Sequence, residues 1–279
     1  MLSACTDLQS YLVNLPANLD HVRVAENIAY GDKIAQKLDL YLPRDKGLAK
    51  PPLIIFFYGG GWTSGDKDVY KFLAESFIEK NYALAVPNYT LYPDAKFPDF
   101  MYDAAKAVSY LYKHHEKYDF DRDNIIIMGH SAGAYIAAML AADKTYLTSV
   151  STKDIPFRAI IGLSGPYAFT PREEPYTNIF GPPKNYPSMK IPAFVTEDIP
   201  PHFLAHGTDD HVVSDKNRIA LTKAIRQQEG EVISKQYDDY DHIDTISTFS
   251  KFWGDEKLRN DVFEYIQNIM QKAKNEKSN

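Results

Sequence analysis

Apolar positions along the chain follow two alternating patterns. Short uninterrupted runs, such as residues 53–58 and 125–128, are typical of strands that are buried on both faces of a sheet. Between such runs, apolar residues recur every three or four positions, as in residues 99–117, which predicts amphipathic helices. Strands and helices that alternate in this way predict an α/β fold with a mainly parallel central sheet and helices on both faces.

The predicted elements cover most of the chain. We expect strands at 22–28, 37–42, 53–58, 82–86, 125–128, 159–163, 202–206 and 231–237. We expect helices at 69–80, 99–117, 215–228 and 258–272, and a further helix soon after the 125–128 strand.

The connection between the strands at 159–163 and 202–206 is long and rich in proline. Such long connections in a compact domain are usually lids or binding loops, so we expect residues 166–201 to form a small Pro/aromatic-rich cap loop. Two interpretations of its aromatic side chains stay open: they wall a pocket for an acyl or alcohol group, or they only pack together. The side chains in question are Tyr167, Phe169, Tyr176, Phe180 and Tyr186.

A serine framed by two glycines follows the 125–128 strand. The sequence Gly129-His-Ser-Ala-Gly133 matches the G-x-S-x-G nucleophile elbow, in which a strained strand-to-helix turn exposes a serine hydroxyl. The residues two before and two after the serine are forced together, so both must lack a side chain. Because the motif lies between a predicted strand and a predicted helix, Ser131 is the candidate nucleophile. The alternative is a Gly-rich turn with a bystander serine.

A nucleophilic serine needs a histidine to take its proton and a carboxylate to orient that histidine. Asp210 follows the 202–206 strand at the spacing of an H-G-x-x-D-x-x-V pattern, and His242 follows the last predicted strand. The chain order Ser, Asp, His is one that such triads use. We therefore expect Asp210 to be the carboxylate and His242 the base. Asp209, which we expect to stabilise the turn, and His211 are their rivals.

Backbone N–H groups are the remaining requirement, because the tetrahedral intermediate of acyl transfer carries a negatively charged oxygen. Three glycines and a tryptophan at 59–62 directly follow the 53–58 strand, and glycines let backbone amides turn toward a ligand with no Cβ in the way. The residue after the nucleophile, Ala132, adds another N–H. The predicted oxyanion hole is therefore Gly60, Gly61 and Ala132, and the alternative is a flexible glycine turn.

Composition narrows the classes of function. The 279 residues are 44% hydrophobic and 24% charged, and no apolar run is long enough to cross a bilayer. A formal net charge of -6 and the absence of an evident basic face argue against nucleic acid as a partner, and we interpret the most basic stretch, Lys272 to Lys277, as a solvated tail because it also contains Glu276. No pair of histidines combines the spacing of a zinc site with a nearby carboxylate ligand, so no metal is expected. Among the other histidines, we expect His130 to point away from the serine's role and His202 and His206 to be packed.

Cys5 is the single cysteine, so no internal disulfide can form. Residues Leu2-Ser3-Ala4-Cys5 resemble the lipobox that ends bacterial lipoprotein signal peptides, although the basic and apolar segments that should precede it are missing. Two interpretations stay open. A lipid anchor at Cys5 implies a lipoprotein on the periplasmic side of the bacterial cell envelope, whereas an accidental match implies a cytoplasmic protein.

These motifs together resemble the α/β-hydrolase fold, on the side of the hormone-sensitive-lipase-like and BD-FAE-type carboxylesterases. The resemblance runs from about Val22 to Ile269, and it rests on the glycine loop, the serine elbow and the segments around Asp210 and His242. One departure is Tyr58, because the family usually has a histidine before the glycines. That histidine mainly braces the loop, so we expect the tyrosine hydroxyl to take over this role.

The resemblance implies hydrolysis of small or short-acyl carboxylic esters through a Ser-His-Asp triad and an acyl-enzyme, with no cofactor. The implied partner is a small-molecule ester, and the oligomeric state stays open. An amide hydrolase, arylformamidase-like or a small peptidase, is one alternative, and a non-catalytic binding protein on a hydrolase scaffold is another. The implied division is an N-terminal segment at 1–20, an α/β-hydrolase catalytic domain at 21–273 and a C-terminal tail at 274–279.

Overall fold

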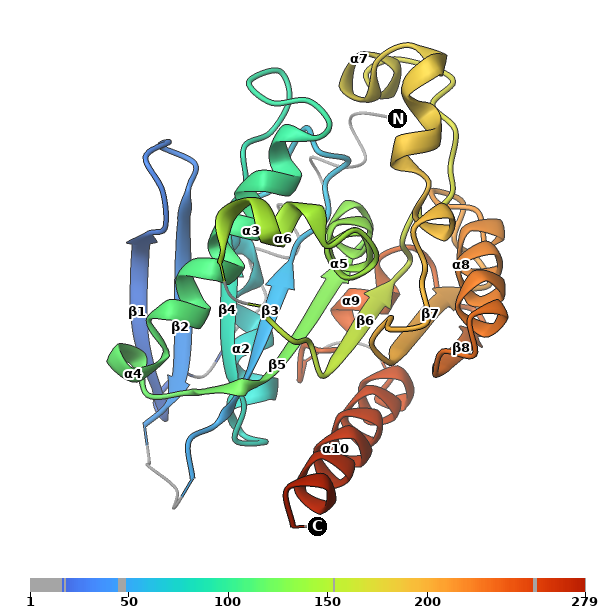
Figure 1. Ribbon diagram of the computed structural model, residues 1–279. Helices are drawn as coiled ribbons and strands as arrows, with labels where there is room; N and C mark the ends of the chain where they lie inside the picture. Colours follow the sequence, from blue (N-terminus) through green and yellow to red (C-terminus); the bar gives the residue numbers. More distant parts are fainter. Residues whose placement is uncertain (1–16, 18, 45–48, 153, 253–254, 279) are drawn as a thin grey trace.

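A single sheet of eight strands runs through the part of the chain that the structure describes. The computed structural model describes residues 17, 19–44, 49–152, 154–252 and 255–278. The strands are β1 (Val22–Ala29), β2 (Lys37–Pro43), β3 (Pro52–Phe57), β4 (Ala83–Pro87), β5 (Asp121–His130), β6 (Ala159–Leu163), β7 (His202–Gly207) and β8 (Val232–Tyr237). Their order across the sheet is β1-β2-β4-β3-β5-β6-β7-β8 (Figure 1).

The direction of the strands decides where the loops after them meet. β1 pairs antiparallel with β2, and β2 pairs antiparallel with β4. All other pairings, from β4 through β3 and β5 to β8, are parallel. The carboxyl ends of β3 to β8 therefore share one edge of the sheet, which is where ligands of such sheets bind.

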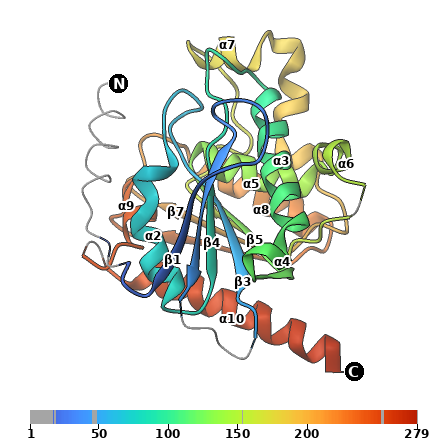
Figure 2. The same cartoon turned by 90° about the vertical axis from the view of Figure 1, so that its left-hand side faces the viewer.

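Helices cover both faces of this sheet. The longer ones are α2 (Lys71–Ile78), α3 (Asp99–Lys113), α5 (Ala132–Ala142), α8 (Lys216–Gln227) and α10 (Lys257–Ser278). In Figure 2, α2 lies on one side of the sheet and α3, α5 and α8 on the other, while α10 packs on α2 through the rings of Phe263 and Phe77. The apolar runs that predicted doubly covered strands are buried as expected, since every residue of β3 after Pro52 and every residue of β5 from Ile125 onward is buried. The predicted α/β-hydrolase fold is confirmed.

Several short or interrupted elements differ from the prediction. The helix predicted at 99–117 breaks at His114, whose imidazole Nδ1 lies 2.7 Å from the carbonyl oxygen of Tyr110, and α4 (His115–Tyr118) follows. The helices α6 (Thr145–Val150) and α9 (Asp244–Ser247) were not predicted. The last helix continues to Ser278 rather than ending at Lys272, because lysine, alanine and glutamate favour helix there. Most of the predicted tail is therefore helical.

The proline-rich connection after β6 forms a cap above the carboxyl edge (Figure 1). It contains α7 (Tyr176–Phe180) and two 3-10 turns, η2 (Pro183–Met189) and η3 (Ile191–Ala193). Hydrogen bonds to neighbouring elements hold it in place: Tyr135 Oη of α5 donates to the carbonyl of Met189 at 2.8 Å, Phe97 N donates to the carbonyl of Ile179 at 2.9 Å, and Ala168 N donates to Asn217 Oδ1 of α8 at 2.8 Å. The predicted lipobox at Leu2–Cys5 lies outside the described residues.

Candidate active site

The elbow around Ser131 has the strained geometry that the motif predicts. Ser131 lies between β5 and α5 with φ 54° and ψ −121°, a backbone conformation that side-chain-bearing residues rarely adopt. A Cβ on Gly129 would lie 2.2 Å from the carbonyl oxygen of Gly133, and a Cβ on Gly133 would lie 1.9 Å from that of Phe57. Both glycines are therefore required sterically. The Ser131 N–H donates to the carbonyl of Leu163 at 2.8 Å, which ties the elbow to β6.

The predicted acid and base are hydrogen-bonded to each other. His242 Nδ1 lies 2.8 Å from Asp210 Oδ2, and the two side chains are buried. The other oxygen, Oδ1, accepts the N–H groups of Val212 and Val213, each at 2.9 Å. Since a carboxylate can only accept, Nδ1 carries the proton that is donated, and Nε2 is the nitrogen that can act as a base.

The environment of Asp210 keeps it ionised. Burial alone would raise the pKa of this carboxyl group, but the hydrogen bond and charge of His242, together with the Val213 N–H, lower it to about 2. A carboxylate that is charged at neutral pH is what a triad requires to orient the histidine and to stabilise its protonated form.

The two rivals do not share this arrangement. Asp209 is exposed, and its N–H donates to the carbonyl of Tyr240 at 3.0 Å, so this residue joins the turn after β7 to the loop before His242. His211 is exposed as well. His202 and His206 are packed as expected, at 1% and 2% exposure.

His130 connects the elbow to the loop of His242. Its Nε2 lies 2.8 Å from the carbonyl oxygen of His242, and the two rings are 4.8 Å apart between centroids. The same carbonyl accepts the hydroxyl of Thr245 at 3.0 Å. The sequence predicts only that His130 points away from the serine's role. It gives no signal for these contacts apart from the fact that His130 adjoins Ser131 and Thr245 lies three residues after His242.

The glycine loop after β3 lies against the nucleophile. A Cβ on Gly59 would be 3.0 Å from the Cβ of Ser131, so the loop and the elbow are in close contact. Gly60 and Gly61 have φ angles of 124° and 60°. The carbonyl of Gly60 accepts the N–H groups of Thr63 and Ser64, each at 3.1 Å, so this carbonyl points into the turn that residues 60–64 form.

The amide groups of this region remain available to a ligand. Within the described part of the chain, the N–H groups of Gly60 and Gly61 have no hydrogen-bond acceptor. Ala132 is the first residue of α5, where a helical N–H has no partner within its own helix. The geometry therefore brings the loop that holds two of the predicted donors next to the elbow that holds the third.

Tyr58 braces the loop with its ring and its main chain. The ring stacks between those of Tyr70 and Tyr89, at centroid distances of 5.7 and 4.8 Å. The carbonyl of Tyr58 accepts the hydroxyl of Tyr89 at 2.9 Å. A Cβ on Gly65 would lie 2.5 Å from the Tyr58 ring, so the far end of the loop packs on it as well. Burial raises the pKa of the Tyr58 phenol well above its usual range, which keeps it neutral.

The cap packs on the residue that ends the glycine loop. Trp62 is 2% exposed, and its ring contacts aromatic side chains from both the cap and the helices. Its neighbours within the cap are Phe169, Tyr176 and Phe180, at centroid distances of 5.7, 6.3 and 4.9 Å. The hydroxyl of Tyr176 would be 3.1 Å from a Cβ on Gly61. Three of the five predicted cap aromatics therefore lie around the glycine loop.

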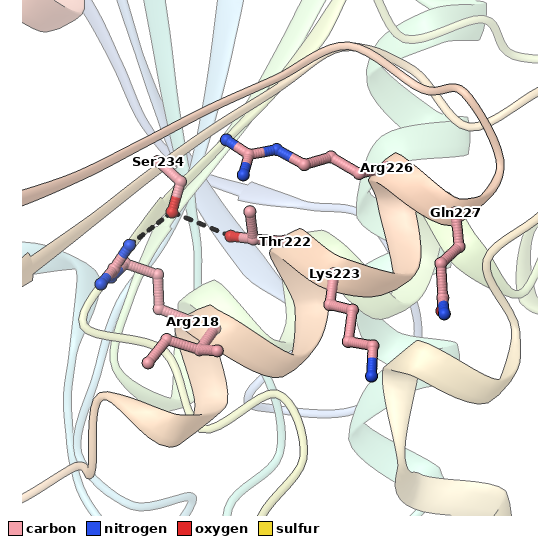
Figure 3. A pocket seen from close by; sticks show the side chains of 7 residues that line it. Arg218, Thr222, Lys223, Arg226, Gln227 and Ser234 are labelled. Carbon is pink, nitrogen blue, oxygen red and sulfur yellow. Dashed lines mark hydrogen bonds between the residues drawn. The ribbon is translucent and has the colours of Figure 1, made fainter.

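A separate open depression lies on α8 and β8 (Figure 3). Ser234 in its wall accepts Arg218 Nη1 at 2.6 Å and the hydroxyl of Thr222 at 2.8 Å, so the serine oxygen is already engaged. The lining contains no histidine that could activate a nucleophile, so this depression is not a candidate active site. It is lined by Arg218, Ile219, Thr222, Lys223, Arg226, Gln227 and Ser234.

The described residues offer neither a cluster of metal ligands nor a membrane-spanning helix. There, no three His, Cys, Asp or Glu side chains gather in a way that could hold a metal ion. None of the helices there combines the length and apolar character that crossing a membrane requires.

Comparisons with known proteins give a matching family and several relatives in sequence. The sequence profile of the BD-FAE family matches residues 38–225, well over half of the chain. A protein of Arabidopsis thaliana named as a probable isoprenylcysteine alpha-carbonyl methylesterase is 30% identical over 213 residues, which is 68% of this chain and 44% of that relative. The kynurenine formamidase of Danio rerio is 28% identical over 152 residues, covering 54% of this chain and 49% of that protein. This chain thus spans about half the length of these curated relatives or less.

Solved structures agree in fold. A crystal structure of esterase B from Lactobacillus rhamnosis, described as inhibited by a tributyrin phosphonate, superposes with a TM-score of 0.83. It is 18% identical, and the superposition covers 99% of this chain and 95% of that one. The family profile, the sheet order and this shared fold lead to one conclusion. The chain belongs to the BD-FAE family of α/β-hydrolases.

Proposed function

We propose that this chain is a serine carboxylesterase that hydrolyses small or short-acyl esters, with residues 21–273 as its catalytic domain. The observation that carries the proposal is the 2.8 Å hydrogen bond between His242 Nδ1 and Asp210 Oδ2. The main-chain carbonyl of His242 is also hydrogen-bonded to the side chain of His130, which directly precedes Ser131. Family membership and the esterase name of the Arabidopsis relative support the class of reaction.

The first half of the reaction forms an acyl-enzyme. Ser131 Oγ attacks the carbonyl carbon of the ester while His242 Nε2 takes its proton, and the electron pair of the C=O bond moves to the oxygen. That oxygen is stabilised by the N–H groups of Gly60, Gly61 and Ala132. When the C=O bond re-forms, the alcohol leaves with the proton from His242. The acyl group stays on Ser131.

The second half releases the acid. A water molecule gives a proton to His242 Nε2 and attacks the acyl carbon, and the charge again collects on the oxygen in the same N–H pocket. Collapse breaks the bond to Ser131 Oγ, which recovers its proton from His242. In both halves the Asp210 carboxylate balances the charge of the imidazolium, and its pKa of about 2 means that it is ionised throughout the neutral pH range.

The cap favours a short acyl group in this proposal. Trp62 closes the glycine loop, and Phe169 and Tyr176 of the cap pack on its ring. We propose that these rings bound the acyl site beside the predicted oxyanion hole and exclude a long chain. The contacts show that these rings pack on one another, and the proposal takes the partly exposed ones, Phe169 and Tyr176, as walls of the acyl site.

A chain-length series tests the proposal. We expect hydrolysis of p-nitrophenyl acetate and butyrate, with less activity on the octanoate. Ser131→Ala should lower kcat by about 10⁶-fold, because the nucleophile of a triad cannot be replaced by the remaining groups. The matched control is Ser214→Ala, at an exposed serine after β7, which should behave as wild type. Esterase activity that survives in folded Ser131→Ala contradicts the assignment of the nucleophile.

Amide hydrolysis is the second candidate, because one relative is named a kynurenine formamidase. The same nucleophile, base and N–H donors serve amides as well as esters. A matched pair of substrates with one acyl group, p-nitrophenyl acetate and p-nitroacetanilide, together with N-formylkynurenine, separates the two. A higher kcat/KM on an amide than on the esters would replace the esterase proposal by this one.

A further inference from the structure

The carbonyl oxygen of His242 is held by two donors that come from different elements. His130 Nε2, at the end of β5, lies 2.8 Å from it, and Thr245 Oγ1, in α9, lies 3.0 Å from it. Both donor side chains are buried, at 3% and 0% exposure. The loop that carries His242 is therefore fixed at its main chain as well as at the Asp210 side chain.

The protonation state of His130 follows from these contacts. A carbonyl oxygen can only accept, so Nε2 carries the proton and donates it. Nδ1 is buried without a partner in the described part of the chain, and it would lie 2.9 Å from a Cβ on Gly59. Burial, and then the neighbouring charge of His242, lowers the pKa of His130 to about 3, so its imidazole is neutral at any pH at which a histidine base works.

His130 is the last residue of a strand inside the sheet. It belongs to β5, where it pairs with Leu163 of β6, and it directly precedes Ser131. Its ring occupies the space that a side chain on Gly59 would need, so it also contacts the glycine loop. One buried imidazole thus touches the three segments whose relative placement decides whether a serine, a base and N–H donors can act together.

Thr245 adds a second support to the same oxygen. Its hydroxyl also lies 3.2 Å from Ser164 Oγ, and Ser164 is fully buried with a φ of 50°. The Ser164 N–H donates to the carbonyl of Ala205, which anchors this residue between β6 and β7. Thr245 is therefore linked to the sheet through Ser164, and His130 is itself a residue of β5.

We propose that His130 and Thr245 are positioning residues that clamp the main-chain carbonyl of His242 and thereby hold the base at the distance from Ser131 that proton transfer requires. This inference rests on the proposed function, in which His242 is the base. Neither residue belongs to the triad or the N–H donors, and neither exchanges a proton with the substrate. In this proposal they act through the placement of His242.

The test compares variants that remove or keep each donor. His130→Phe removes the donor and keeps a flat ring, and His130→Gln keeps an N–H at a similar reach. Thr245→Val removes the hydroxyl, and Thr245→Ser keeps it. We expect the Phe and Val variants to lower kcat on p-nitrophenyl butyrate by up to about 100-fold, because a base displaced by about 1 Å loses that much. KM should change little, and the Gln and Ser variants should recover part of kcat.

A matched control separates positioning from stability. His202 is also a buried histidine whose imidazole lies near one carbonyl, that of Pro200 at 2.7 Å from Nδ1, with Nε2 unpartnered in the described part of the chain. It begins β7, at the edge of the sheet away from the elbow. His202→Phe should lower the melting temperature as His130→Phe does, but it should leave kcat unchanged.

The double variant His130→Phe/Thr245→Val gives an independent readout. The two donors share one acceptor, so the loss of kcat in the double variant should differ from the product of the two single losses. Wild-type kcat in folded His130→Phe and in folded Thr245→Val would overturn the inference. If His130→Phe does not fold, Thr245→Val and Thr245→Ser decide it.

These outcomes are distinct from a failure of the proposed function. That failure would appear in the wild-type protein, as an absence of ester and amide hydrolysis and of reaction between Ser131 and a fluorophosphonate. If the wild type is active and labelled at Ser131 while all clamp variants retain wild-type kcat, only the inference about His130 and Thr245 is rejected.

Discussion

Asp210 contributes to the site through both of its carboxylate oxygens. Oδ2 accepts His242 Nδ1, and Oδ1 accepts the N–H groups of Val212 and Val213. An asparagine could keep one of these interactions but carries no charge, and its amide would favour the wrong tautomer of His242. We therefore expect Asp210→Asn to lower kcat by about 10⁴-fold with little change in KM. Steady-state kinetics on p-nitrophenyl butyrate measure this, and a loss no larger than that of Asp209→Asn would contradict the role.

The lowered pKa of Asp210 also predicts a dependence of stability on pH. The pKa falls from 3.8 to about 2 on folding, so the folded state binds fewer protons. The resulting stabilisation is fully present above pH 3.8 and is lost as the pH falls toward 2, and it amounts to at most about 2 kcal/mol.

Urea unfolding between pH 5 and pH 2 checks this prediction. The free energy of unfolding of the wild type should fall over that window by more than that of Asp210→Asn, which has no carboxyl group to protonate. Parallel curves for the two proteins would show that Asp210 does not have a lowered pKa in the folded state.

At the residue scale, the sequence makes specific predictions where a residue stands in a local motif. Ser131, Asp210 and His242 were proposed from their neighbours in sequence and their order along the chain, and the structure places Asp210 and His242 in contact. The contact between His130 and His242 joins residues 112 positions apart, and no spacing rule connects them. It depends on how the loops after β5 and β8 meet, which only the folded chain specifies.

At the scale of elements, the glycine loop is the most constrained segment. Gly60 has a φ of 124°, and a Cβ there would lie 2.0 Å from the carbonyl oxygen of Ser64. Gly60→Ala should therefore displace the N–H groups and lower kcat by about 10²–10³-fold. The control is Gly230→Ala, just before β8, where a Cβ would lie 2.8 Å from methyl groups of Ile199 and Ile225 and 3.2 Å from the carbonyl oxygen of Ile225, so it should lower stability but leave kcat unchanged. A Gly60→Ala protein with wild-type kcat would mean that this loop supplies no oxyanion donor.

The brace under that loop can be tested at Tyr58. The sequence indicated a bracing hydroxyl, whereas the structure gives the main role to the stacked ring and the carbonyl. Tyr58→Phe keeps the ring and should cost about 1 kcal/mol of stability with most activity retained. Tyr58→Ala should cost about 3–5 kcal/mol and most of the activity. If thermal unfolding and kinetics show equal losses in both variants, the hydroxyl and not the ring is the brace.

Long, strongly patterned elements were predictable, and short ones were not. The buried apolar runs of β3 and β5 identified both strands within a few residues. The helix α9 has four residues and α6 has six, which is too short for a helical period to appear in the sequence. The break between α3 and α4 falls at His114, whose side chain contacts the Tyr110 carbonyl, and the apolar pattern gives no sign of it.

For the whole molecule, the parallel sheet accounts for the convergence of the site. Because β3, β5, β7 and β8 all run in one direction, the glycine loop, the elbow and the loops of Asp210 and His242 emerge at the same edge (Figure 1). This convergence was predictable from the alternation of strands and helices. The packing of the cap was not, because its irregular sequence has no period from which contacts could be inferred.

The cap should set the preference for acyl length. Phe169 stacks on Trp62 with 5.7 Å between ring centroids, so Phe169→Ala opens space beside the glycine loop. We expect the ratio of kcat/KM on p-nitrophenyl octanoate to that on the acetate to rise. Phe252→Ala, at an exposed phenylalanine of the segment after α9, is the control and should keep the wild-type ratio. An unchanged ratio in Phe169→Ala would mean that the cap aromatics only pack.

The central claim is that Ser131 is activated by His242, and covalent labelling tests it most directly. The protein is treated with a fluorophosphonate, the modified peptide is mapped by mass spectrometry, and the rate is compared between the wild type and His242→Gln. We predict a single adduct on Ser131 in the wild type and a rate lower by at least about 10³-fold in the variant. An adduct on another residue, or equal rates in the two proteins, would contradict the account.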